Sequence, residues 1–279
     1  MTTVAVLGTG KMGGAMARRL KQSGFDLILW NRTPERAQNL NVGPVARTPV
    51  DAARKADVVL SSLTGPEAVR EVYLGRHGVF EDIKGKVIIE MSTAGPAIVE
   101  ELARAASAKG ALLVEAPVVG SVPAVESGTL MVLVGGPTDA LERARPVLEK
   151  LGEVHHIGDL GTAPRLKLVA NSMLAIVNAA AAELLAAGTA AGIDREKVFS
   201  ILTRFAPALK ARENNYLNDR HEPAMFATRD ILKDLDLALD VYHRSARTAP
   251  LTSLTRELFG EAARKNPDLD ISAIARRYA

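Results

Sequence analysis

Lys167 and Asn171 are the residues of this chain whose types and spacing best suit proton chemistry. They stand four positions apart in a long apolar segment, so a helix there would place both side chains on one face. A carbonyl reduced by hydride needs a proton donor, which a lysine ammonium can supply, and an asparagine one turn later can hold the same oxygen or orient the lysine. The alternative for Lys167 is a structural residue that extends its charge to solvent or pairs with a carboxylate, since burying a lone charge is costly.

A glycine turn near the N-terminus is the element that would hold a hydride carrier. Residues 3–36 read as an apolar strand, a glycine turn, a helix that starts at about Lys11, and a second strand. Gly8 allows the tight turn, Gly10 lets the backbone approach a pyrophosphate, and Gly13 lets the helix pack closely on the strand. The alternative is a plain structural turn. The pattern favours a dinucleotide site with these contacts: Gly8, Thr9, Gly10, Lys11, Met12 and Gly13.

The end of the second strand favours NADP(H) over NAD(H). NAD-specific sites usually place an acidic residue there to bond the ribose 2′-hydroxyl, and that carboxylate would repel a 2′-phosphate. This chain has neutral Asn31 followed by Arg32 and Thr33, and a guanidinium with a neighbouring hydroxyl suits a phosphate. An alternative, compatible with the first, is that these residues cap the next helix, with Thr33 as the N-cap and Pro34 as the first helical residue.

Two further segments carry candidate substrate contacts. Residues 115–121, EAPVVGS, follow a predicted strand, and ligands of doubly wound sheets bind at the carboxyl ends of strands. Backbone N–H groups near Gly120 and Ser121 could hold an anion, although an ordinary connection between strands would read the same way. In residues 233–238, KDLDLA, Lys233 could reach a cofactor or a substrate carboxylate and Asp234 could orient it, or the aspartate is a partner of the helix dipole.

Composition narrows the class of protein. The 279 residues are 47% hydrophobic and 24% charged, as in ordinary globular proteins of one large or two modest domains. A net charge of +3 with dispersed Lys and Arg does not favour nucleic acid or an anionic membrane as a partner. Cysteine is absent and the five histidines lack metal-ligand spacing, so we expect neither disulfides nor a metal. Because a strand begins at the third residue, no signal peptide is expected and the cytoplasm is the predicted location.

The pattern of elements predicts an α/β fold with a doubly wound Rossmann sheet, a long linking helix and an all-α C-terminal domain. Up to about residue 160, short apolar strands alternate with amphipathic helices, as in a parallel sheet covered on both faces. The predicted strands are Val4–Leu7, Leu27–Trp30, Val58–Leu60, Val87–Glu90, Leu112–Glu115, Leu130–Val134 and Glu153–His156. The predicted helices are Gly13–Ser23, Pro66–Tyr73, Ala97–Lys109 and Thr138–Leu151, the last capped by Gly152. The predicted domains are residues 1–160 and 161–279.

Segment Leu166–Ala191 predicts one long helix that joins the two domains. It is long enough to span a membrane, but Lys167, Asn171 and Glu183 interrupt it and no aromatic belt flanks it. We therefore expect a helix packed on all sides by protein, and no membrane partner. Later helices are predicted at Arg195–Arg204, Leu232–Thr248 and Pro250–Ala263. Apolar surface beyond what one subunit covers predicts a homodimer or homotetramer.

Taken in order, these segments make the chain resemble the β-hydroxyacid dehydrogenase family from about Val4 to Leu239. The motifs that carry the resemblance are GTGKMGGAMA, WNRT, STAGP, EAPVVGS with GTL, GTAPRLKLVAN and KDLDLA. The resemblance implies an active site in the cleft between a Rossmann and a helical domain, and a small carboxylate or carbonyl substrate. It makes Lys167 the catalytic lysine and Asn171 the substrate-contacting asparagine. The other matched positions are Leu63 near the cofactor, Thr93 near the cofactor and substrate, Gly120 in the substrate loop, and Lys233 supported by Asp234.

One position departs from the family pattern. Val119 stands where the substrate loop of the family usually has serine, which removes a hydroxyl bond to the substrate carboxylate worth about 1.5–3 kcal/mol. Ser121 resembles the glyoxylate and succinic semialdehyde reductases, and with Asn31-Arg32-Thr33 it favours an NADPH-driven reductase of short-chain aldehyde acids. Two alternatives stay open. One is an imine reductase, or a reductase of bulkier carbonyls, against which Lys167 argues, and the other is a nucleotide-binding sensor without catalysis.

Overall fold

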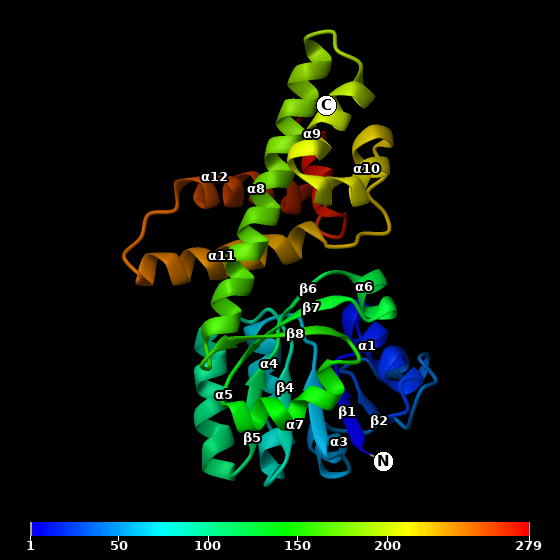
Figure 1. The fold of residues 1–279 in the computed structure, drawn as a ribbon, viewed down its shortest axis with the longest axis vertical. Helices are drawn as coiled ribbons and strands as arrows, with labels where there is room; N and C mark the ends of the chain where they lie inside the picture. Colours follow the sequence, from blue (N-terminus) through cyan, green and yellow to red (C-terminus); the bar gives the residue numbers. More distant parts are fainter. Residues whose placement is uncertain (1, 279) are drawn as a thin grey trace. The chain divides into compact units, whose positions relative to one another are not determined.

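The computed structural model describes residues 2–278, and the chain divides into two compact units, residues 1–167 and 168–279 (Figure 1). The first unit is an α/β Rossmann fold and the second is helical, as predicted. Helix α8, Thr162–Ala190, contains the division, whereas the predicted domain boundary at residue 160 lies in the turn before this helix. That boundary stays a prediction.

The first unit is built, within the described residues, on an eight-stranded sheet of order β2-β1-β3-β4-β5-β7-β6, with β8 paired to β7. Strands β1 to β5 are parallel, and the winding direction changes between β1 and β3, where doubly wound sheets bind their ligands. The strands are β1 Thr3–Leu7, β2 Asp26–Trp30, β3 Val58–Ser61, β4 Val87–Glu90, β5 Leu112–Glu115, β6 Val118–Val119, β7 Leu130–Gly135 and β8 Gly152–Gly158.

The sheet is mixed rather than parallel throughout, which corrects the prediction. β7 is antiparallel to β5 and to β6, a two-residue strand that was not predicted, whereas β8 runs parallel to β7. Between β6 and β7 the chain holds only the short helix α6, Val122–Ser127, and a parallel return needs a crossover of a dozen or more residues. Apolar runs in the sequence do not encode strand direction, so the periodicity could not reveal this reversal.

Helices cover both faces of the sheet, because alternate residues of a strand point to opposite sides. Val4 and Val6 of β1 lie in one core with Leu20, while Leu7 lies in a second core with Tyr73. The helices of this unit are α1 Lys11–Gln22, α2 Pro34–Gln38, α3 Pro49–Arg54, α4 Pro66–Leu74, the 3₁₀ turn Val79–Glu81, α5 Pro96–Lys109, α6 and α7 Thr138–Leu148.

The end of α7 differs from the prediction. The helix ends at Leu148 with Glu149 as its C-cap, and Gly152 is the first residue of β8 rather than a helix cap. A Cβ at position 152 would lie 1.9 Å from the carbonyl oxygen of Leu130, so this glycine is needed where β8 meets β7. A glycine after a helical pattern has the same sequence signature in both roles.

The second unit packs its helices around Phe199, Tyr216, Leu235 and Phe259. Its elements after α8 are α9 Arg195–Phe205, the 3₁₀ turn Pro207–Arg212, α10 Glu213–Asn218, α11 Thr228–Arg244, α12 Pro250–Lys265 and the 3₁₀ turn Ile271–Tyr278. Helix α11 begins and ends about one turn before its predicted bounds. Its start is held by the Thr228 N–H, which donates to Leu269 O at 2.9 Å, and the chain leaves the helix before Ala246, at φ +52°.

Helix α8 has the length and apolar composition of a membrane span, but half of its most apolar window is buried inside the protein. Its Asn171 and Asn178 amides are buried and donate to protein oxygens, as in a core helix. The prediction of packing on all sides is wrong for the single chain, because Val169 is 50% exposed and Met173 61% exposed. One stripe of the helix is therefore left uncovered.

Candidate active site

The glycine turn after β1 has the geometry that a dinucleotide site requires. Gly8 adopts φ +91°, and a Cβ there would lie 2.3 Å from the carbonyl oxygen of Ser62. A Cβ at Gly13 would lie 1.9 Å from the Gly8 carbonyl oxygen, so α1 packs directly on the turn. A Cβ at Gly10, by contrast, would meet nothing within 4 Å. Gly8 and Gly13 are therefore required by the fold itself, and Gly10 leaves the backbone open to a ligand.

The N-terminus of α1 suits a negatively charged group. No side chain among residues 2–278 caps it, its first turn contains no acidic residue, and Arg19 and Lys21 lie in its last turn. The Thr9 hydroxyl is buried and has no hydrogen-bond partner within the described part of the chain. Helix N-termini attract anions, and a buried hydroxyl needs a partner. Residues 9–13 thus fit the pyrophosphate of a dinucleotide.

Asn31 is tied to the glycine turn. Its Oδ1 accepts from the Thr9 N–H at 2.9 Å, and its Nδ2 donates to the Thr33 carbonyl oxygen at 2.9 Å. Thr33 and Pro34 occupy the N-cap and first position of α2, as predicted, although the Thr33 side chain makes no cap bond in the described structure. Asn31 therefore positions the glycine turn. Arg32, which follows it, is exposed and could bind an anionic group at this end of β2.

The loops that contain Leu63 and Thr93 are held by a buried carboxyl group that the sequence analysis missed. The Leu63 N–H donates to Ser92 Oγ at 2.8 Å, and the Ser92 N–H donates to Glu90 Oε1 at 3.0 Å. The Ser61 hydroxyl also donates to Glu90 Oε1. Glu90 thus links the carboxyl ends of β3 and β4. The available signal was its place at the end of the apolar strand VIIE, where a surface residue would look the same.

Glu90 has a counterpart on the next strand. Glu115 is the register partner of Glu90 in β5, and both side chains are almost fully buried. Burial raises the pKa of each carboxyl to about 7, against which the hydrogen bonds from Ser92 at Glu90 and from Gly161 at Glu115 act to lower it. Two buried carboxyls of raised pKa therefore lie at the carboxyl ends of neighbouring strands.

Because the pKa values of Glu90 and Glu115 are raised, we expect the free energy of unfolding to fall as pH rises from about 4.5 to about 7. In this window the folded chain keeps protons that the unfolded chain has released. The protonated carboxyls stabilise the folded state fully below their pKa in the unfolded chain, about 4.5. This stabilisation is lost as the pH rises past their pKa in the folded chain, about 7. Ionisation of each carboxyl is expected to lower the free energy of unfolding by about 1–3 kcal/mol. Denaturant unfolding of Glu90→Gln at about pH 5 and about pH 8 should therefore show a weaker dependence on pH than the unmodified chain.

The control for this measurement is Glu126→Gln, which alters an exposed carboxylate of the same unit. It should keep the full pH dependence. A difference in unfolding free energy between the unmodified chain and Glu90→Gln that does not change with pH would contradict the prediction.

The predicted substrate loop follows β5. Gly120 adopts φ +139°, and a Cβ there would lie 2.6 Å from Leu130 Cδ2, so glycine is required. Val119 is 37% exposed in β6, and Ser121 is the N-cap residue of α6. The loop therefore presents an apolar side chain at the position where the family usually has a hydroxyl.

Lys167 is half-buried on α8, five residues after the first residue of that helix. The first turn of α8 is bonded to β5. Both carboxylate oxygens of Glu115 accept from the Gly161 N–H at 2.8 Å, and Oε1 accepts from the Ala163 N–H at 3.1 Å. The lysine thus follows a helix start that is held by a buried side chain.

The second unit brings three predicted residues together. Asn171 Nδ2 donates to Asp234 Oδ2 at 2.5 Å, and Lys233 Nζ lies 2.7 Å from Asp234 Oδ1. Asp234 is 2% exposed, so its carboxylate is held between an amide from α8 and an ammonium from α11. This arrangement orients Asn171, one turn after Lys167 on the same helix, and it pairs Asp234 with Lys233, the residue that it was expected to support. The roles of these residues toward a substrate stay predictions.

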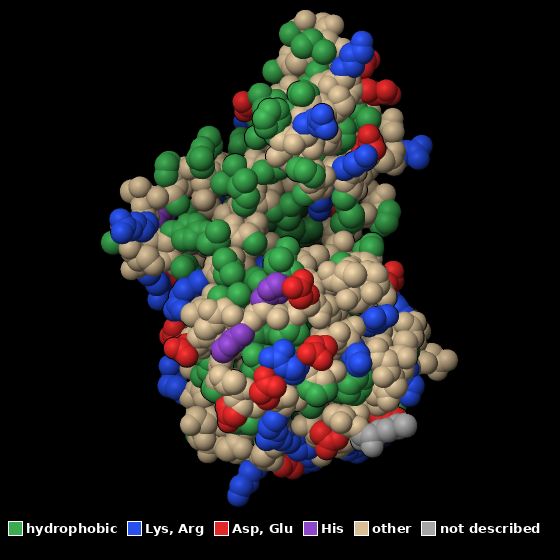
Figure 2. All heavy atoms as spheres, viewed as in Figure 1, with side chains coloured by type: hydrophobic (Ala, Val, Ile, Leu, Met, Phe, Trp, Pro, Cys, Tyr) green, Lys and Arg blue, Asp and Glu red, His purple; other side chains and the backbone are tan. Residues whose placement is uncertain are grey.

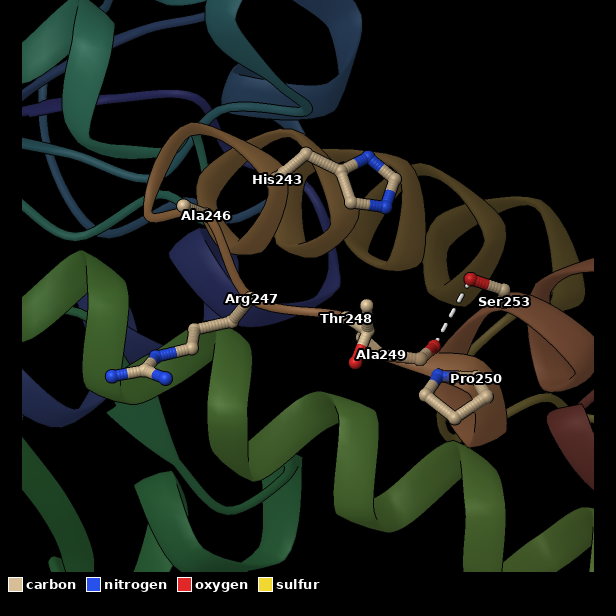
Figure 3. Close-up of a pocket in the computed structure, with 7 residues that line it drawn as sticks. All are labelled: His243, Ala246, Arg247, Thr248, Ala249, Pro250 and Ser253. Atoms are coloured by element: carbon tan, nitrogen blue, oxygen red, sulfur yellow. Dashed lines mark hydrogen bonds between the residues drawn. The ribbon is translucent and has the colours of Figure 1, made fainter.

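The second unit also has an open cavity of about 420 Å³ at the turn between α11 and α12 (Figure 3). It is lined by His243, Ala246, Arg247, Thr248, Ala249, Pro250 and Ser253. The Ser253 hydroxyl donates to the Ala249 carbonyl oxygen, as the dashed line in Figure 3 marks. None of the predicted site residues lines this cavity, so it does not coincide with the candidate site.

Two family models match the chain. Residues 3–158 match the NAD binding domain of 6-phosphogluconate dehydrogenase, and residues 161–278 match the NAD-binding region of NADP-dependent 3-hydroxyisobutyrate dehydrogenase. The 3-hydroxyisobutyrate dehydrogenase of Pseudomonas aeruginosa is 32% identical over 100% of this chain and 99% of its own length. An NAD-dependent L-serine dehydrogenase of the same organism is 31% identical over 93% of this chain and 91% of its own length. The structure of Mycobacterium tuberculosis 3-hydroxyisobutyrate dehydrogenase with L-serine superimposes with a TM-score of 0.88 and 30% identity, covering 99% of each chain.

Proposed function

The chain belongs to the β-hydroxyacid dehydrogenase family of oxidoreductases, and we propose that it is an NADP(H)-dependent enzyme that interconverts a small hydroxy acid and its aldehyde acid. The observation that carries the proposal is the Lys167–Asn171 pair on α8, with Asn171 oriented by Asp234. The relatives support a substrate that carries a carboxylate and a nearby CH–OH group, since 3-hydroxyisobutyrate and L-serine share both.

In the proposed reaction the nicotinamide cofactor, held by residues 8–13, supplies or accepts the hydride. Lys167 donates a proton to the carbonyl oxygen during reduction and removes it from the hydroxyl during oxidation. Asn171 holds the same oxygen, and Asp234 keeps its amide turned for that bond. Backbone N–H groups near Gly120, with Thr93, bind the substrate carboxylate.

The preference for NADP(H) rests on Arg32, whose charge suits a 2′-phosphate. Arg32→Gln is expected to lower kcat/KM for NADPH by about 10- to 100-fold, because a charge-assisted bond is lost. The value for NADH should stay within about twofold, which makes NADH the internal control. Steady-state kinetics with both cofactors measures this. Asn31 is left unchanged because its amide holds the glycine turn. Equal losses with the two cofactors would mean that Arg32 does not select the phosphate.

The proposal as a whole is tested by assaying a panel of compounds with NADP(H) and NAD(H) in parallel. The panel contains 3-hydroxyisobutyrate, L-serine, glyoxylate, succinic semialdehyde and a cyclic imine. We expect turnover of a hydroxy or aldehyde acid. Turnover of the imine alone would favour the second candidate, an imine reductase, which the exposed apolar Val119 supports. Tight NADPH binding without turnover of any compound would favour a sensor.

We also propose that the chain acts in the cytoplasm as a homodimer or homotetramer. The support for an oligomer is a set of exposed apolar side chains on α8 and α12 of the second unit. Figure 2 shows hydrophobic side chains gathered over the helices on the face that it draws. The exposed fractions are 50% for Val169, 61% for Met173, 51% for Leu184, 65% for Leu251 and 59% for Leu254. An apolar surface of this kind usually marks an interface.

A further inference from the structure

The buried Glu115 carboxylate is bonded to the start of the helix that carries Lys167. A helix leaves its first backbone N–H groups without partners inside the helix. At α8 the Gly161 and Ala163 N–H groups donate to Glu115, which lies 0% exposed at the end of β5. The carboxylate also lies at the positive end of the helix dipole, which offsets part of the cost of burying its charge.

The neighbouring strand leaves room for this side chain. Gly135 of β7 is the register partner of Glu115, and a Cβ at position 135 would lie 2.1 Å from Glu115 Oε1. The carbonyl oxygen of Asp159 would lie 3.0 Å from the same Cβ. Any side chain at position 135 would therefore displace the carboxylate from α8.

From these contacts we propose that Glu115 is a positioning residue, which holds the first turn of α8 and thereby sets the place of Lys167. The inference rests on the proposed function for the role of Lys167. The lysine lies about one and a half turns beyond the bonded N–H groups, so a change in the direction of the first turn moves its ammonium. A displacement of about 1 Å is enough to reduce a reaction rate about 100-fold.

If Glu115 only stabilised the fold, removing its charge would lower the free energy of unfolding together with the turnover. Burial raises the pKa of Glu115 to about 7, so at higher pH the ionised carboxyl is destabilising relative to a neutral group of the same shape. Glu115→Gln is therefore not expected to lower the free energy of unfolding at about pH 8. A loss of turnover without a loss of stability would identify positioning rather than structural support.

The experiment compares Glu115→Gln and Gly135→Ala with the unmodified chain. We expect kcat to fall about 10- to 100-fold in both, with the dissociation constant of NADPH within about twofold. Backbone amide exchange at Gly161 and Ala163 should become faster in both. Glu115→Asp shortens the side chain by one methylene and should give kcat and exchange rates between those of the unmodified chain and Glu115→Gln. It also serves as a test variant if Glu115→Gln or Gly135→Ala does not fold. The control is Glu100→Gln, which removes the exposed ion-pair partner of Arg165, a residue in the first turn of α8. It should change neither kcat, nor the dissociation constant of NADPH, nor the amide exchange.

Two results would overturn the inference. One is unchanged amide exchange at Gly161 and Ala163 in Glu115→Gln. The other is faster exchange with unchanged kcat, which would make Glu115 a cap without influence on the reaction. Failure of the proposed function would look different, because Lys167→Ala would then keep its turnover while the exchange at these amides still depended on Glu115.

Discussion

Lys167→Ala is expected to lower kcat by about 10³-fold, because proton transfer by a positioned group contributes about 10²- to 10⁴-fold to a rate. The dissociation constant of NADPH should change by less than about threefold, since the glycine turn and Arg32 remain intact. Single-turnover kinetics at saturating cofactor, together with fluorescence titration of NADPH, separates the two quantities.

The control is Lys197→Ala, which removes an exposed lysine from the first turn of α9. It should retain full turnover. If Lys167→Ala keeps more than about a tenth of the activity, the proton does not pass through this ammonium and the proposed mechanism is wrong.

Gly13→Ala is expected to damage both the fold and the cofactor site. Its Cβ would lie 1.9 Å from the carbonyl oxygen of Gly8, a backbone atom that cannot move without changing the turn. We expect a loss of about 2–4 kcal/mol in the free energy of unfolding and at least a tenfold weaker NADPH affinity. Chemical denaturation and fluorescence titration measure the two effects.

The neighbouring Gly14 offers a matched control on the same helix. A Cβ there would lie 3.4 Å from Leu40 Cδ2, which is ordinary contact with the end of a side chain. Gly14→Ala should therefore keep NADPH affinity and gain up to about 1 kcal/mol from helix propensity. Equal effects of the two substitutions would show that close packing at Gly13 is not what the turn requires.

Several parts of the site were predictable because they follow local rules. The tight turn at Gly8 and the close approach at Gly13 were predicted from spacing and are confirmed by the contacts of these residues. The place of Thr33 before α2 was also predicted. The hydrogen bond by which Asn31 holds Thr9 was not predicted. From the sequence, Asn31 was considered only as a neutral residue in the place of an acidic one.

By itself the sequence determined the alternation of the longer strands and helices of the first unit, the dinucleotide turn, and a long helix bearing a lysine and an asparagine one turn apart. These features depend on periodicity and steric rules within a few residues. Only the tertiary structure decided that β7 runs antiparallel to β5 and that the carboxyl of Glu115 is bonded to the start of α8. The reason is that such contacts join residues far apart in the chain, as Glu115 and Gly161 are at a separation of 46 positions. Strand direction and the partner of a buried charge depend on where the chain returns, which local patterns do not encode.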